Sequence, residues 1–228
     1  MGSHAADRLA ARPRARPRSW VAASVLALAL LVGLTVVVTR RALPPDIDTW
    51  WAALVGGVRS PLLDGIALTF NVIGSGLVAR VIIPLVAVAV LLARRRVAPA
   101  LYLIVATVIS GVVVGVLKNI VARDRPTDGL VAVGFGSFPS GHAANAAVLT
   151  VALALLLRRG WVWWSALALT VLMMLSRTYL GVHWLTDTIG GALLGAATAA
   201  GAFAAYEVLH RRRISQAADS AGTDPRGR

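Results

Sequence analysis

Three consecutive segments read VWWSALALTVLMML (162–175), SRTYLGVHWLTDTIGG (176–191) and ALLGAATAAGAFAAY (192–206). The first and third are uncharged and apolar, as expected for helices buried in a membrane. The middle segment contains three ionisable side chains, namely Arg177, His183 and Asp187. Because ionisable groups at membrane depth are costly and are kept mainly for function, the middle segment is a candidate site flanked by two spans.

The whole chain has the composition of a membrane protein. It has 228 residues, of which 57% are hydrophobic, and a mean hydropathy of +0.74. Several uncharged runs of about 20 residues are each long enough to cross the hydrocarbon core as a helix. We therefore expect an all-α fold, a polytopic membrane helical bundle with six transmembrane helices. The absence of cysteine excludes disulfides, thiolate catalysis and Cys-ligated metal sites.

The apolar runs divide the chain into one membrane domain and two tails. The expected spans lie at about 20–39, 73–93, 98–117, 138–157, 161–176 and 184–207. Short interfacial helices are expected within 42–71, with Trp50 and Trp51 at headgroup depth. The domain thus covers 20–207, and an Arg-rich tail at 1–19 and a second tail at 208–228 are expected to be disordered and cytoplasmic.

The distribution of basic residues predicts the orientation. The net charge is +13, from 22 Arg and one Lys against 10 acidic residues. The charges are scattered among the spans, so nucleic acid is not an expected partner. With both termini in the cytoplasm, 15 of the 23 cations lie on that side, which agrees with the positive-inside rule. The Ala- and Arg-rich composition indicates a bacterial protein, hence a multi-pass protein of the cytoplasmic (inner) membrane.

Eight ionisable residues gather at the outer ends of the third to sixth spans. They are Lys118, Arg123, Asp124, Arg125, His142, Arg177, His183 and Asp187. Taken singly, a cation at a span end is most often a snorkelling anchor, and a His–Asp pair is often a buried structural hydrogen bond. Two histidines, a carboxylate and several cations on one side of the membrane instead indicate a site.

Local patterns sharpen the chemistry of this site. In FPSGH (138–142), Pro139 favours a helix start, and Ser140 and Gly141 are expected to offer free backbone N–H groups to an anion. His183 and Asp187 are four residues apart and would share a helix face. Asp187 can then accept a hydrogen bond from one ring nitrogen and leave the other free to attack.

Three cations, Lys118, Arg125 and Arg177, are expected near the N–H groups of Ser140 and Gly141. Cations in this arrangement fit a phosphate, whose oxygens gain negative charge during the reaction. A metal bound by the two histidines and the carboxylate is disfavoured, because the cations would repel a divalent ion. A membrane transporter or channel is the alternative class, although its charges should line a path through several depths. Arg80 is unassigned: it is either a snorkelling residue or a contact for a substrate head group.

Three motifs together resemble a known signature: Lys118-x6-Arg125-Pro126, Pro139-Ser140-Gly141-His142 and Ser176-Arg177-x5-His183-x3-Asp187. They are similar in residue type, order and spacing to the signature of the type 2 phosphatidic acid phosphatase superfamily, the lipid phosphate phosphatases. The resemblance implies an integral-membrane, metal-independent phosphatase without a cofactor, with a helical core and a site at the outer face. Vanadate-dependent haloperoxidases share the signature, but their soluble nature disagrees with six spans.

The resemblance also implies a role for each residue of the signature. His183 corresponds to the nucleophile that forms a phosphohistidine, and Asp187 to the residue that holds it. His142 corresponds to the general acid that protonates the leaving oxygen and then activates water. The phosphate-binding residues are Lys118, Arg125, Ser140, Gly141 and Arg177.

The implied partner is a membrane lipid phosphate in the bilayer, either a monoester or a diphosphate. Undecaprenyl diphosphate is the first expectation, because an outward site on a short chain suits recycling of a lipid carrier. Phosphatidylglycerol phosphate and phosphatidic acid are the alternatives. No residue outside the signature identifies the head group, and the sequence does not predict the oligomeric state or the role of the Arg-rich tail.

Overall fold

The computed structural model describes residues 17–40, 45–74 and 77–222. Within these residues all regular structure is helical, which confirms the all-α class. The elements are α2 (Pro17–Arg40), α3 (Asp46–Gly57), α4 (Pro61–Ile73), the π-helical turn η1 (Val78–Ile82), α5 (Ile83–Ala93), α6 (Val97–Val121), α7 (Gly141–Leu157), α8 (Gly160–Tyr179) and α9 (Leu185–Gly222).

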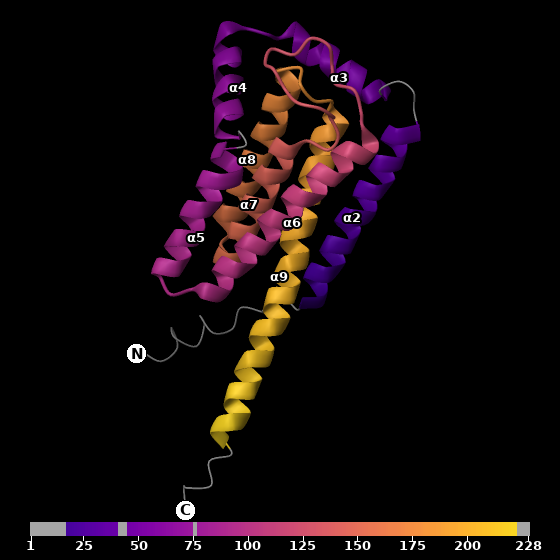
Figure 1. Cartoon of the computed structure of the whole chain (residues 1–228). Helices are drawn as coiled ribbons and strands as arrows, with labels where there is room; N and C mark the ends of the chain where they lie inside the picture. Colours follow the sequence, from indigo (N-terminus) through magenta and orange to yellow (C-terminus); the bar gives the residue numbers. More distant parts are fainter. Residues whose placement is uncertain (1–16, 41–44, 75–76, 223–228) are drawn as a thin grey trace, which may run out of the picture.

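The helices form one elongated bundle (Figure 1). One end, which we call the loop end, carries α3 and the segments that join α6 to α7 and α8 to α9 (Figure 1). The opposite tail end holds the start of α2, and the last turns of α9 project beyond it (Figure 1). The segments that contain most of the predicted site residues therefore lie at the end remote from both described chain ends.

Membrane-spanning helices are present, but the expected number of six is not confirmed. By length and hydropathy, three helices of the described chain can cross a membrane: α2, α6 and the Leu185–Arg212 part of α9. A fourth span requires α4 and η1–α5 together, which are bent by 44° at the break between them. α7 has 17 residues and is therefore only about 26 Å long, shorter than the hydrocarbon core.

The second expected span, 73–93, includes a break between two helices. α4 ends at Ile73 and is capped by Gly74, whose N–H donates to the Phe70 carbonyl at 2.8 Å. α3 lies across the loop end, whereas α4 lies along the bundle above α5 (Figure 1). That these short helices lie at the membrane interface stays a prediction.

The expected disorder after residue 207 is also wrong for most of that segment. α9 continues through 208–222 to Gly222; this stretch contains three Arg and three Ala, which favour helix. Residues 223–228 and most of the predicted N-terminal tail, 1–16, lie outside the described residues.

α7 and α9 pack with their backbones in contact. A Cβ atom at Gly191 would lie 2.3 Å from the Ser140 carbonyl oxygen, and one at Gly195 would lie 2.4 Å from that of Ala144. On the other side of α9, a Cβ at Gly201 would lie 2.9 Å from Ser24 Oγ of α2. The glycines of α9 therefore allow close helix packing.

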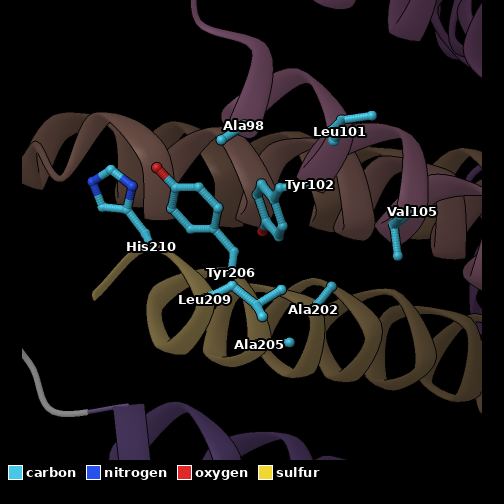
Figure 2. A pocket seen from close by; sticks show the side chains of 9 residues that line it. All are labelled: Ala98, Leu101, Tyr102, Val105, Ala202, Ala205, Tyr206, Leu209 and His210. Carbon is cyan, nitrogen blue, oxygen red and sulfur yellow. The ribbon is translucent and has the colours of Figure 1, made fainter. Parts of the chain in front are cut away.

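Aromatic residues fill the tail end of the bundle. Tyr102 of α6 contacts Phe203 and Tyr206 of α9, and its hydroxyl donates to the Ala199 carbonyl at 3.1 Å. Beside them, a mostly apolar cavity of about 210 Å³ lies between α6 and α9, with Tyr206 and His210 at its edge (Figure 2). This cavity is at the opposite end from most of the predicted site residues.

Replacing Gly195 by Ala should destabilise the bundle by about 1–3 kcal/mol, because the new methyl group would overlap the α7 backbone. The matched control is Gly115→Ala in α6, where an added Cβ has no neighbour within 4 Å. Thermal unfolding of both variants in detergent, followed by tryptophan fluorescence, measures the difference. Equal unfolding midpoints would show that the α7–α9 contact does not limit stability.

Candidate active site

His183 and Asp187 are brought together, though not on one helix as predicted. His183 lies in the loop before α9, whereas Asp187 lies in the first turn of that helix. The His183 Nδ1 atom is 3.5 Å from Asp187 Oδ2, and its Nε2 atom is 3.4 Å from an Arg125 guanidinium nitrogen. The Nδ1 contact is longer than a full hydrogen bond.

The Asp187 carboxylate is fixed by its other contacts. Its side chain is fully buried, Oδ2 accepts from the Trp184 backbone N–H at 2.9 Å, and Oδ1 accepts from Arg123 at 2.5 Å. Because both oxygens are held, the carboxylate keeps a constant direction toward the His183 ring.

Burial lowers the pKa of His183 to about 4, and the neighbouring cations Arg125 and Lys118 act in the same direction. Asp187 opposes this shift through its negative charge. The lowered pKa keeps the imidazole neutral at pH 7, so one ring nitrogen retains the lone pair that a nucleophile needs.

His142 faces the same space from the second residue of α7. Its ring lies near the Asn71 backbone at the end of α4, and it interacts electrostatically with His183 and Arg177. Its Nε2 atom is buried and has no hydrogen-bond partner among the described residues. A ring nitrogen without a protein partner can deliver or accept a proton.

Neutral acceptors hold the three predicted cations. Lys118 Nζ donates to the Gly136 carbonyl at 2.5 Å, and Arg125 donates to the carbonyls of Gly136 at 2.8 Å and Val182 at 2.5 Å. Arg177 is 1% exposed and donates to the Asn71 side-chain oxygen. Within the described chain none of the three forms an ion pair, so their charge remains available to an anion.

The α7 N-terminus differs from the prediction at one atom. The Ser140 N–H donates to the Asp187 carbonyl at 2.9 Å, so the expectation of a free N–H there is wrong. The cause is the close contact of α7 and α9, which places the two backbones within hydrogen-bonding distance. Ser140 Oγ is buried and has no hydrogen-bond partner among the described residues. Gly141 opens the helix, where backbone N–H groups lack intrahelical acceptors.

The sequence did not predict a buried cluster of polar contacts around Asp187. We call its members Asp48, Arg123 and Thr186 the clamp. Asp48 of α3 is fully buried and accepts from the Thr186 backbone N–H at 2.8 Å and from Thr186 Oγ1 at 2.6 Å. Arg123 bridges Asp48 at 2.7 Å and Asp187 at 2.5 Å, and its guanidinium lies over the Trp184 ring. The clamp therefore ties α3 to the first turn of α9.

Two further residues hold side chains of the site, and no sequence motif indicated them: Asn71 contacts Arg177, and Asp48 contacts Thr186. Asn71 is one of three polar residues in the mostly apolar α4, with Asp64 and Thr69, and Asp48 is one of two acids in PDIDT (45–49). Arg123 was included among the outer charges, but no role was predicted for it. Arg80, left unassigned by the sequence, places Nη2 2.7 Å from the position of a Cβ atom at Gly141.

Replacing Asp48 by Ala should cost about 3–5 kcal/mol of stability, because Arg123 and the Thr186 N–H would lose a buried partner. Asp46→Ala is the matched control, since Asp46 is exposed in the same first turn of α3. Thermal unfolding in detergent should give a lower midpoint for Asp48→Ala only. Similar midpoints for both variants would contradict a structural role of the clamp.

The His183 pKa also predicts how stability depends on pH. The unfolded histidine has a pKa of about 6.5 and the folded one a pKa of about 4, so acid favours the unfolded state. Stability should fall by up to about 3 kcal/mol as the pH drops from 6.5 to 4, and His183→Gln should lose less over this range. Unfolding midpoints measured across these pH values test it; parallel curves for wild type and variant would contradict it.

Residues 99–211 match the model of the PAP2 superfamily. Phosphatidylglycerophosphatase B of Bacillus subtilis is 40% identical over 90 residues, which is 35% of this chain and 44% of the relative. An undecaprenyl-diphosphatase of Sulfolobus acidocaldarius is 46% identical over 59 residues, 26% of this chain and 28% of the relative. The chain thus aligns with less than half of the length of these curated relatives.

Two solved structures share the fold over most of their length. The transmembrane PAP2-type phosphatidylglycerolphosphate phosphatase from Bacillus subtilis has a TM-score of 0.66 at 24% identity, covering 83% of this chain and 96% of the other. Aquifex aeolicus LpxE has a TM-score of 0.58 at 28% identity, covering 70% and 96%. The family match, the two folds and the clustered motifs lead to one conclusion: this chain belongs to the PAP2 superfamily.

Proposed function

We propose that this chain is a lipid phosphatase of the membrane that hydrolyses a phosphate monoester or diphosphate through a phosphohistidine. One observation carries the proposal: a neutral, buried His183 lies between Asp187 and Arg125, opposite the unpaired Nε2 atom of His142. A nucleophile, a residue that orients it and a proton donor thus surround one positively charged space.

In the first half-reaction, His183 Nε2 attacks the phosphorus atom, and the bond from phosphorus to the leaving oxygen breaks. His142 donates a proton to that oxygen, so the leaving group departs neutral at this atom. Asp187 stabilises the positive charge that develops on the His183 ring. In the second half-reaction, His142 takes a proton from water, and the resulting hydroxide displaces His183 and releases inorganic phosphate.

The cations bind the phosphate and stabilise its transition state. Lys118, Arg125 and Arg177 approach from α6, the following loop and α8, and neutral groups hold each one. Charges that are already oriented before the reaction need little rearrangement as the oxygens gain charge. The Gly141 N–H and the Ser140 hydroxyl supply further donors, and the proposed chemistry requires no metal or cofactor.

We further propose that the helices cross the bacterial cytoplasmic membrane six times, with α4 and α5 forming one broken crossing. The described start of α2 and the end of α9 lie at the tail end, which supports a cytoplasmic location for both termini (Figure 1). The site then faces the extracytoplasmic side. A lipid can reach it laterally while its chains stay in the bilayer, and phosphate leaves to the outside.

Undecaprenyl diphosphate is the first candidate substrate, with phosphatidylglycerol phosphate and phosphatidic acid as alternatives. The names of the two curated relatives support the first and second of these. A transporter or channel is disfavoured, because the ionisable groups of the site gather at the loop end instead of lining a path along the bundle.

The purified protein in detergent with excess EDTA should release phosphate from at least one of these lipids. His183→Ala should lower the rate at least about 1,000-fold while the thermal midpoint stays near that of the wild type, because the nucleophile is lost. His210→Ala is the matched control, an exposed histidine at the tail end. Full activity of His183→Ala, or loss of all activity in EDTA, would refute the mechanism.

A further inference from the structure

Arg80 is a cation at the site that the proposed mechanism does not use. It projects from η1, and its Nη2 and Cζ atoms lie 2.7 and 3.9 Å from the position of a Cβ atom at Gly141. It interacts electrostatically with Lys118 and with His142. Within the described residues it forms no ion pair. Its charge thus adds to that of the phosphate-binding cations, beside the start of α7.

A cavity of about 330 Å³ extends from Arg80 between η1, α6 and α7. Asn145 and Thr107 contribute polar groups to its wall, and most of the other lining residues are apolar. Val108 and Val112 of α6 also line it and are 56% and 60% exposed, so the cavity reaches the apolar outer surface of the bundle. A space with a cation in its wall and apolar walls elsewhere fits an anionic group joined to a hydrocarbon chain.

Simple snorkelling does not explain this position. A snorkelling arginine extends toward water, away from other charges. The Arg80 guanidinium instead lies against Gly141 and close enough to Lys118 for the two positive charges to repel each other. Arg80 itself is exposed, whereas Lys118 beside it is partly buried. Gathering like charges around a partly buried cation is unfavourable unless an anion binds among them.

We propose that Arg80 binds a second phosphate group of the substrate, next to the phosphate that is transferred, and that the preferred substrates are lipids carrying two phosphates. This inference rests on the proposed function and names its substrate class. Two sources share this chemistry, a lipid diphosphate and a lipid whose two phosphates are separated by a short linker.

The proposed reaction explains why the second phosphate meets Arg80. His142 protonates the leaving oxygen, so the remainder of the substrate extends from the His142 side of the transferred phosphate. Gly141 precedes His142, and the Arg80 guanidinium lies against it. For a diphosphate, the bond from the terminal phosphorus to the bridging oxygen breaks, and that oxygen leaves with the lipid monophosphate, whose phosphate Arg80 then contacts.

The test compares Arg80→Gln with the wild type on two matched pairs of lipids, in detergent with EDTA. One pair is farnesyl diphosphate and farnesyl monophosphate, and the other is phosphatidylglycerol phosphate and phosphatidic acid. We expect kcat/KM to fall about 10- to 100-fold for the two-phosphate member of at least one pair, mainly through KM, and less than about 3-fold for the single-phosphate lipids. Arg80→Lys should retain part of the preference.

Arg94→Gln is the matched control, because it removes one arginine from the exposed far end of the same broken helix. Thermal midpoints near that of the wild type establish that the variants are folded. If Arg80→Gln loses kcat/KM selectively on farnesyl diphosphate, the preferred substrate is a lipid diphosphate. If it loses kcat/KM selectively on phosphatidylglycerol phosphate, the preferred substrate is a lipid whose two phosphates are joined by a linker. Equal losses within both pairs would overturn this inference and leave the proposed function intact, whereas a wild type inactive on every lipid would overturn both.

Discussion

The direct backbone contact between α7 and α9 is the constraint on which the site depends. Side chains at Gly191 and Gly195 would separate the two helices, and the hydrogen bond from the Ser140 N–H to the Asp187 carbonyl would be lost. The same contact sets the start of α7, and hence His142, opposite the start of α9. The distance between the proposed nucleophile and the proposed proton donor is therefore fixed by glycine packing, outside the site itself.

Charged groups that lie behind the site also hold Asp187 in position. Arg123 connects Asp48 to Asp187, and Asp48 in turn holds both donors of Thr186. Arg123, Asp48 and Asp187 are each ion-paired and also hydrogen-bonded, which is the condition under which buried ions are tolerated. The carboxylate that faces His183 thereby keeps its position.

The sequence identified a set of candidate site residues that the structure brings together, whereas it missed a helix break. His142, His183, Asp187 and the three cations follow fixed spacings, and these could be recognised without coordinates. Asp48 and Asn71 act through contacts with residues more than 65 positions away, and no local pattern encodes such pairs. The predicted span missed the break after α4 because it was based on mean hydropathy, which does not register that Gly74 in the GSG segment (74–76) caps a helix.

Asn71 has a consequence for how the site can respond to its surroundings. Its side-chain oxygen accepts from Arg177, and its backbone lies near the His142 ring. It lies three residues before Gly74, where α4 ends, and Arg80 stands just beyond the 44° bend. A tilt of α4 relative to α5 would therefore displace Arg177, the proposed phosphate ligand, and change the surroundings of His142, the proposed proton donor. Bilayer thickness or lateral pressure that tilts α4 would thus act on both proposed functions at once.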